Sequence, residues 1–289
     1  MYTLNHALEQ LQSPPSNSDV LTLPIAHLTT APSFKQIAET RELRTDNCKY
    51  FNRPLLYFSY GGVFHRHGRQ VPSYEPFGQD DSSSVEESFH APVAILFAPN
   101  LLDKINCFFP YDTGAAHTGK YGSFNDSLSQ FDQYKVSRVP SEELHELTSK
   151  FVYNFYNTNR QYLRGSVSTE VEDRISSLEP PLQQLLITLL NFLRTRLQGV
   201  DHRQRAIECQ ASESIPLDKE IFSKIIWIGL PDLFSWQDFR EICGRLGGEP
   251  ANIPDFDFYD FCSSREPSQI AAVLESKAKD IIVKRYYQR

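Results

Sequence analysis

The sequence contains little of what membrane-spanning, disulfide-bonded or metal-binding proteins require. It has no run of the roughly 18 consecutive apolar residues that a membrane-spanning helix needs. Its first residues show no basic segment followed by an apolar run, which argues against a secretory signal peptide. The five cysteines are an odd number and no two are spaced as C-x-x-C, so a disulfide framework and a cysteine zinc site are disfavoured. These absences predict a soluble, reduced, cytoplasmic protein without a bound metal.

Common motifs for nucleotides and nucleic acids are also missing. No G-x-G-x-x-G follows an expected strand and no G-x-x-x-x-G-K-[ST] occurs, which disfavours a Rossmann site and a P-loop. Asp and Glu number 36 against 29 Lys and Arg, so the formal charge is −7. The chain therefore has no general excess of basic residues for binding nucleic acid. A local basic strip is still conceivable, formed by Arg194, Arg196, Arg203 and Arg205. The same arginines could equally be a solvated helix end and strand edge.

The composition is that of a folded chain with a substantial core. Hydrophobic residues make up 40% of the 289 residues, which excludes global disorder. Apolar runs predict strands at 20–28, 55–60, 93–98, 203–210 and 224–230. Helical spacing and capping residues predict helices at 3–11, from Pro32 to Leu43, and at 141–156, 182–197, 235–246 and 268–286. Strands and helices do not alternate in a strict β-α-β order, so we expect an α+β fold. We expect an N-terminal extension (1–19) followed by one α+β domain (20–289) with a helical insertion around 140–200.

A histidine and a threonine stand near the end of the first expected strand. His27 and Thr29 would project to the same side, because side chains alternate along a strand. Thr30 and Pro32 are typical of the first turn of a following helix. Together His27 and Thr29 could hold a ribose or another hydroxylated group. The alternative is that His27 covers the sheet edge and Thr30 merely caps the helix.

The expected strand at 55–60 carries tyrosines and ends in two glycines. Alternation places Tyr57, Ser59 and Gly61 on one face and Tyr60 on the other. A tyrosine ring can stack on a planar cationic heterocycle, and glycines let a ligand approach the backbone. The alternative is an aromatic core strand that ends in a hairpin turn.

A carboxylate lies on the expected strand at 203–210. Ile207 and Cys209 would face the core, which puts Glu208 and Gln210 on the opposite face. A carboxylate at a cleft can accept a proton or stabilise a developing positive charge. The alternative is a strand residue that simply faces solvent.

Two other interpretations compete with a site around Glu208. The segment 110–124 has loop composition, and its Asp112 and His117 could combine with His65 in a hydrolase or nuclease. No standard ligand spacing supports a metal there. The acidic, serine-rich segment 80–87 instead suits a non-catalytic interaction or regulatory protein.

The order of these pieces resembles the ADP-ribosyltransferase superfamily with a His…Tyr…Glu pattern. A strand with His27-Leu28-Thr29 precedes a helix, and a strand bearing Tyr57 follows. Later, Arg205-Ala206-Ile207-Glu208 precedes Ile215-Pro216-Leu217. This last part looks most like the DNA-modifying toxin branch, in which an R-A-E-type strand precedes a V-P or I-P turn. The similarity covers residues 20–62 and 203–230.

The resemblance implies a split mixed sheet and an NAD-dependent transferase, a toxin or defence effector acting on nucleic acid or protein. Glu208 would stabilise the ribosyl cation that forms as nicotinamide leaves, with Glu213 as the alternative carboxylate. The other implied contacts are Tyr57 or Tyr60 on nicotinamide, His27 and Thr29 on the adenosine-side ribose, and Arg53 or Arg66 on the diphosphate. No metal is implied.

Overall fold

The chain folds into two compact units that interleave along the sequence. The computed structural model describes residues 2–64 apart from 17 and 19, 91–195, 202–246, 253–261 and 267–287. The first unit consists of Met1–Leu23, Asn47–Tyr60 and Leu102–Ser212, and the second of Pro24–Asp46, Gly61–Leu101 and Glu213–Arg289. Both units mix strands and helices, and parallel and antiparallel pairs both occur, so the expected α+β class is confirmed.

The first unit contains a short antiparallel sheet with β8 in a central place. The strand order is β4 (Arg53–Tyr60), β8 (Glu208–Ala211), β6 (Cys107–Phe109) and β7 (Val136–Ser137), and β3 (Asp46–Cys48) pairs with β4. Glu208 lies opposite Ser59 of β4 and opposite Phe109 of β6. Strand β8 is therefore paired along both of its edges, which makes it an interior strand.

Helices form most of the remainder of the first unit. They are α1 (Leu4–Gln10), α4 (Thr113–His117), α5 (Asn125–Leu128), α6 (Phe131–Tyr134), α7 (Leu144–Tyr156), α8 (Asn159–Leu163), α9 (Val171–Ile175) and α10 (Pro180–Arg194). The buried stripe of α7 follows the helical spacing that the sequence predicts, with Leu147, Phe151 and Phe155 enclosed. Helix α1, from the expected N-terminal extension, packs against α7 and α10, so this helix contributes to the core of the first unit.

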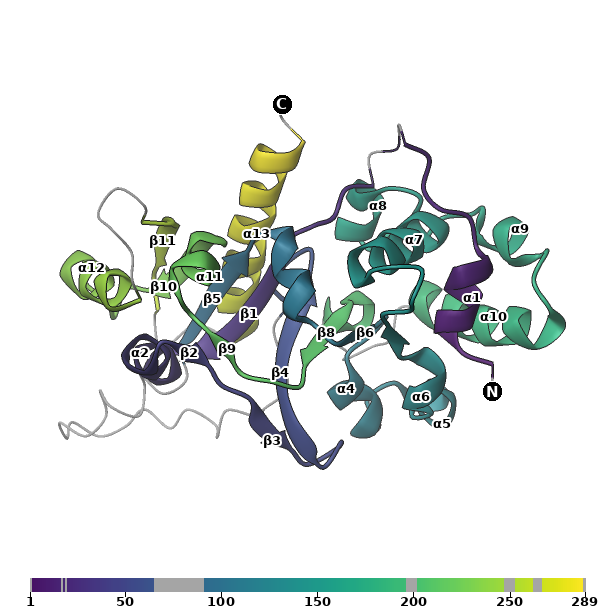
Figure 1. Cartoon of the computed structure of the whole chain (residues 1–289), viewed down its shortest axis with the longest axis horizontal. Helices are drawn as coiled ribbons and strands as arrows, with labels where there is room; N and C mark the ends of the chain where they lie inside the picture. The colour runs from purple at the N-terminus through teal and green to yellow at the C-terminus, as the bar shows by residue number, and fades with distance from the viewer. Residues whose placement is uncertain are drawn as a thin grey trace. The chain divides into compact units, whose positions relative to one another are not determined.

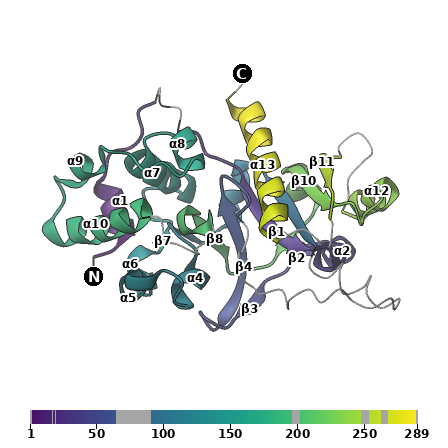
Figure 2. The same ribbon diagram turned by 180° about the vertical axis from the view of Figure 1, so that it is seen from behind.

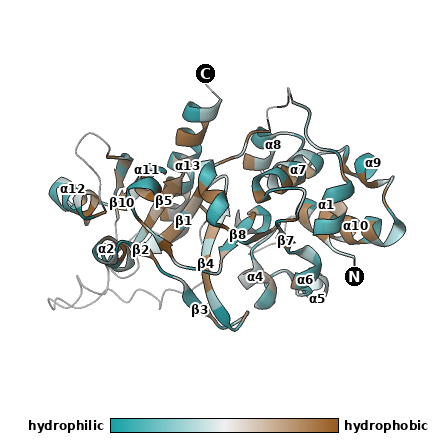
Figure 3. Cartoon of the chain, viewed as in Figure 1, coloured by the Kyte–Doolittle hydropathy of each residue, from teal (hydrophilic) through white to brown (hydrophobic). Residues whose placement is uncertain are grey.

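The second unit contains two strands that are buried on both faces. Its strand order is β1 (Ile25–Thr30), β5 (Pro92–Phe97), β10 (Ile225–Pro231) and β11 (Asp255–Tyr259), and β2 (Glu42–Leu43) pairs separately with β9 (Ile215–Pro216). Every residue of β5 and β10 is buried, which accounts for their continuous apolar sequences. Figure 3 shows much of β5 and β10 in the brown of hydrophobic residues.

Helices border this second sheet. They are α2 (Ala31–Thr40), α11 (Lys219–Ser223), α12 (Trp236–Arg245) and α13 (Pro267–Tyr286), and a 3₁₀ turn, η1 (Pro99–Lys104), follows β5. Figures 1 and 2 show α13, in yellow, running along this sheet, and it packs against β10. Helix α2 begins as expected, because Thr30 Oγ1 accepts a hydrogen bond from Ser33 N at 3.4 Å. None of the helices in the described ranges is long and apolar enough to span a lipid bilayer.

The first strand begins later than predicted. It spans Ile25–Thr30, whereas the apolar pattern predicts 20–28. The segment before it is held by side chains: Leu23 N donates to Tyr60 Oη at 2.9 Å, and Asn159 Nδ2 donates to Leu21 O at 2.6 Å. Pro24 has no N–H for a strand ladder, so extended pairing cannot start before it.

The predicted strand at 203–210 is also shorter than expected. A 3₁₀ turn, η3 (His202–Arg205), precedes β8. Gln204 Nε2 donates to Phe192 O at 2.8 Å and to Thr195 O at 2.6 Å. These carbonyls stand at the C-terminal end of α10, where helical backbone lacks intrahelical partners. The turn therefore supplies the cap of α10 instead of extending the sheet.

Candidate functional site

Glu208 is enclosed, although it was expected on the strand face that points away from the core. Only 8% of the residue is exposed. Its Oε2 accepts a hydrogen bond from Thr113 N at 3.1 Å. Its Oε1 accepts from Thr113 Oγ1 and from Gln210 Nε2, both at 2.7 Å. The expectation of an open second face is wrong at Glu208, because Thr113 at the start of α4 covers this carboxylate.

Opposing effects set the pKa of Glu208. Burial removes the water that would stabilise the anion, and the nearby Asp112 carboxylate repels a second negative charge. The hydrogen bonds from Thr113 and Gln210 favour the anion, but by less, so the pKa rises from its ordinary 4.5 to about 7. A carboxyl group with this pKa exchanges its proton near neutral pH, which suits acid–base chemistry.

Helix α4 places the donors that hold Glu208. Asp112 caps this helix, since its Oδ1 accepts from Ala115 N at 2.6 Å, and the backbone O of Asp112 accepts from Tyr121 Oη at 3.2 Å. Thr113, the first helical residue, is 1% exposed and turns both its N–H and its hydroxyl toward Glu208. The segment 110–124 was expected to be a loop, and the Asp112 cap explains why it contains a helix instead.

Strand β4 brings two further side chains to the face of Glu208. Ser59 lies opposite Glu208 and Tyr57 lies opposite Gln210, so the four side chains share one face of the sheet. Tyr57 and Ser59 are half-buried, while their neighbours in sequence are buried, as the alternation predicts. The structure therefore unites Tyr57 and Glu208, which are 151 positions apart, on adjacent strands.

Tyr60, the alternative to Tyr57, is a core residue. None of its surface is exposed. Its hydroxyl accepts from Leu23 N at 2.9 Å and donates to Leu21 O at 3.5 Å, and its ring centroid lies 5.8 Å from that of Tyr162. These contacts leave no ring face for nicotinamide, so Tyr57 is the tyrosine of this strand that can meet a ligand.

Arg53 begins β4 and brings a cation to the same strand face as Tyr57. Its guanidinium carbon lies 5.5 Å from the centroid of the Phe51 ring. Its Nε is buried and has no hydrogen-bond partner in the part of the chain that the structure describes. Its charge, with that of Lys135, lowers the pKa of Cys107, although burial outweighs both and raises that pKa to about 11. An unsatisfied guanidinium N–H suits an anionic ligand.

Several aromatic side chains lie around Phe51, just before the start of β4. Phe109 lies opposite Glu208 on β6, and the Phe51 centroid is 6.1 Å from that of Phe109 and 5.1 Å from that of Phe131. Tyr50 packs on His117 with centroids 4.4 Å apart. Phe51, Phe131 and Tyr50 are half-buried, so they present aromatic surface beside the strand.

His27 and Thr29 belong to the second unit. On β1 they lie opposite Ile95 and Val93 of β5, and both are half-buried. Their joint approach to Glu208, which belongs to the first unit, stays a prediction. Arg66 lies outside the described residues, and so does the acidic segment 80–87.

The residues of the hydrolytic alternative have other contacts. The Asp112 carboxylate caps α4, and His117 is exposed and packs on Tyr50. His65 lies outside the described residues. Within the described ranges, no group of three or more His, Cys, Asp and Glu residues could hold a metal ion.

Two arginines of the possible basic strip have described side chains, and both make contacts within the protein. Arg194 forms an ion pair with Glu172. Arg205 Nε donates to Leu193 O at 3.1 Å, and its guanidinium also donates to Gly165 O at 2.5 Å. The side chains of Arg196 and Arg203 lie outside the described part. Arg194 and Arg205 therefore serve the packing of the first unit.

A buried tyrosine joins the end of β4 to the entry of β8. Tyr162 Oη donates to Tyr60 O at 2.8 Å and accepts from Ile207 N at 3.2 Å. Tyr162→Phe would remove both of these buried hydrogen bonds, so we expect the free energy of unfolding to fall by about 2 kcal/mol. Urea denaturation measures this change. The control Tyr153→Phe, whose ring packs on Arg174, should stay within about 0.5 kcal/mol; equal losses in both variants would contradict the assignment.

Comparisons with known proteins leave the family of this chain open. No protein-family model matches it, and no curated protein matches it. The proposal on function therefore rests on the geometry around Glu208.

Proposed function

We propose that this chain is an NAD-dependent ADP-ribosyltransferase whose functional carboxylate is Glu208. One observation carries the proposal. The Glu208 carboxylate, fixed by Thr113 and Gln210, lies on the same sheet face as the half-buried Tyr57 and Ser59. A sheet face that combines a rigid carboxylate with an aromatic ring suits a substrate that has a ribose next to a planar cationic ring.

The role of Glu208 follows from the charge that develops during the reaction. As the bond between nicotinamide and ribose breaks, the ribose gains positive charge. An ionised Glu208 stabilises that charge, and because Thr113 and Gln210 already hold its oxygens, it needs little reorganisation. The proton of the incoming nucleophile then passes to the carboxylate, which a pKa of about 7 permits near neutral pH.

Other residues of β4 would contact the nicotinamide and the diphosphate of NAD. The Tyr57 ring would pack on nicotinamide. Arg53 would bind the diphosphate through charge-assisted hydrogen bonds, and its Nε, which has no partner among the described residues, supports this assignment. In this proposal His27 and Thr29 bind the adenosine-side ribose. The acceptor is a nucleophile on nucleic acid or protein, as befits a toxin or defence effector.

Binding of NAD to the full chain tests the proposal. Calorimetric titration should give saturable binding, and Tyr57→Leu should weaken it by about fivefold, because the variant loses an aromatic contact. Tyr153→Leu, on α7, is the matched control and should keep the wild-type affinity. Absence of saturable heat, or equal weakening by both variants, would contradict the proposal.

A further inference from the structure

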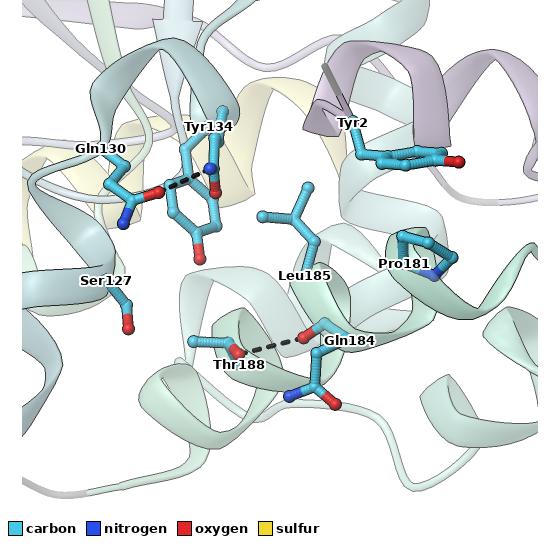
Figure 4. A pocket seen from close by; sticks show the side chains of 9 residues that line it. Tyr2, Ser127, Gln130, Tyr134, Pro181, Gln184, Leu185 and Thr188 are labelled. Carbon is cyan, nitrogen blue, oxygen red and sulfur yellow. Dashed lines mark hydrogen bonds between the residues drawn. The ribbon is translucent and has the colours of Figure 1, made fainter.

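A concave site lies within the first unit, and Glu208 is not among the residues that line it. Helices α5, α6 and α10 and the start of the chain enclose a pocket of about 430 Å³, a volume in the range of small-molecule sites (Figure 4). The lining residues are Tyr2, Ser127, Gln130, Gln133, Tyr134, Pro181, Gln184, Leu185 and Thr188. They include none of the residues assigned to NAD, so the pocket is a separate site.

The lining offers hydrogen bonds but no formal charge. The three glutamines supply amide donors and acceptors, and Ser127 and Thr188 supply hydroxyls. Pro181, Leu185 and the Tyr2 ring add apolar surface. A phosphate or carboxylate would lose water here without gaining an opposite charge, which is costly. The lining therefore favours a neutral ligand with many hydroxyl or amide groups.

The hydroxyl of Tyr134 points into the pocket. Tyr134 is only 1% exposed, and Figure 4 shows its hydroxyl directed into the space between Ser127 and Leu185. No described residue forms a hydrogen bond with this hydroxyl. A hydroxyl that points into a pocket can donate a hydrogen bond to a ligand and accept one from it.

The amides around Tyr134 are already oriented. Gln133 Nε2 donates to Gln130 Oε1 at 2.5 Å, which leaves the Gln130 amino group as a donor and the Gln133 carbonyl as an acceptor. Thr188 Oγ1 donates to Gln184 O at 3.0 Å, so its oxygen is able to accept. The pocket thus presents both donors and acceptors, which matches hydroxyls, because each hydroxyl both donates and accepts.

The pocket is also lined by an exposed aromatic ring, that of Tyr2. Tyr2 is 43% exposed, and its ring lies nearly parallel to that of His6, at 12° and 6.5 Å between centroids. A sugar ring presents C–H groups that pack on an aromatic face, and hydroxyls at its rim. We propose that this pocket binds a neutral saccharide, with Tyr134 and the glutamines contacting its hydroxyls. The proposal is independent of the proposed reaction with NAD.

Titration of the full chain with saccharides tests this inference. The neutral probes are glucose, N-acetylglucosamine, maltose and cellobiose, and the charged probes are glucose 6-phosphate and glucuronate. Saturation-transfer NMR and calorimetry should show saturable binding of at least one neutral probe, with the charged probes at least fivefold weaker. Tyr134→Phe and Gln184→Ala should each weaken the bound neutral probe by about fivefold, the loss expected for one hydrogen bond.

Matched variants outside the pocket serve as controls. Tyr153→Phe on α7 and Gln237→Ala on α12 make the same chemical changes elsewhere and should keep the wild-type affinity. Equal melting temperatures show that Tyr134→Phe keeps the fold. The inference is overturned if no neutral probe saturates, if a charged probe binds more tightly, or if both pocket variants bind like wild type.

Discussion

Release of nicotinamide from NAD is expected to fall by at least about a hundredfold in Glu208→Gln, while the affinity for NAD changes by less than about twofold. The charge of Glu208 acts on the ribosyl cation, which exists only as the bond breaks. The interaction is therefore much stronger in the transition state than with bound NAD, and its loss lowers turnover more than binding. Nicotinamide release at saturating NAD, beside calorimetric binding, measures both quantities.

The substitution is conservative because glutamine can keep the contacts of Glu208. Its carbonyl can accept from Thr113 N, and its amino group can donate to Thr113 Oγ1 and to a rotated Gln210 carbonyl. Glu213→Gln is the matched control, since Glu213 is exposed and follows β8 closely. It should release nicotinamide at the wild-type rate. The opposite pattern, a loss in Glu213→Gln alone, would transfer the catalytic role to Glu213.

The contribution of Glu208 to the stability of the folded chain is expected to fall by about 3 kcal/mol as pH rises from about 4.5 to about 7. Its pKa is raised in the folded chain, so between these values the folded form binds the proton and the unfolded form releases it. This stabilisation is complete below pH 4.5 and is lost as pH rises through 7.

Variants separate this contribution from other titrating groups. Glu208→Gln cannot ionise, so its stability relative to wild type should increase from pH 5 to pH 8 by about 3 kcal/mol. Glu213→Gln should show no such change. Urea unfolding of the three proteins at both pH values measures the differences. A constant difference between wild type and Glu208→Gln would show that the carboxyl group has an ordinary pKa.

Parts of the fold were predictable because their signals are local. The apolar runs at 55–60 and 93–98 lie within β4 and close to the bounds of β5, and Thr30 with Pro32 marks the start of α2. Alternation along β4 also predicts that Tyr57 and Tyr60 face opposite ways. Only the structure shows that Tyr60 is fully buried whereas Tyr57 is half-buried.

The environment of Glu208 was not predictable from its own strand. The group that encloses it is Thr113, 95 positions away, and alternation says nothing of what covers a second face. The sequence Asp112-Thr113-Gly114-Ala115 does carry a helix-capping signal, since Asp is a preferred cap, and it could have revealed α4. The saccharide pocket draws residues from position 2 to position 188, so no local pattern marks it.

The pH dependence of kcat/KM for nicotinamide release tests the central claim most directly, because it reports the protonation of Glu208 in the free enzyme. The account predicts that kcat/KM rises with pH and levels off above an apparent pKa of about 7, the value that burial and Asp112 impose on this carboxyl group. It also predicts that the rise disappears in Glu208→Gln. A wild-type profile that stays flat from about pH 5 to pH 9, or a rise that persists in Glu208→Gln, would contradict the account.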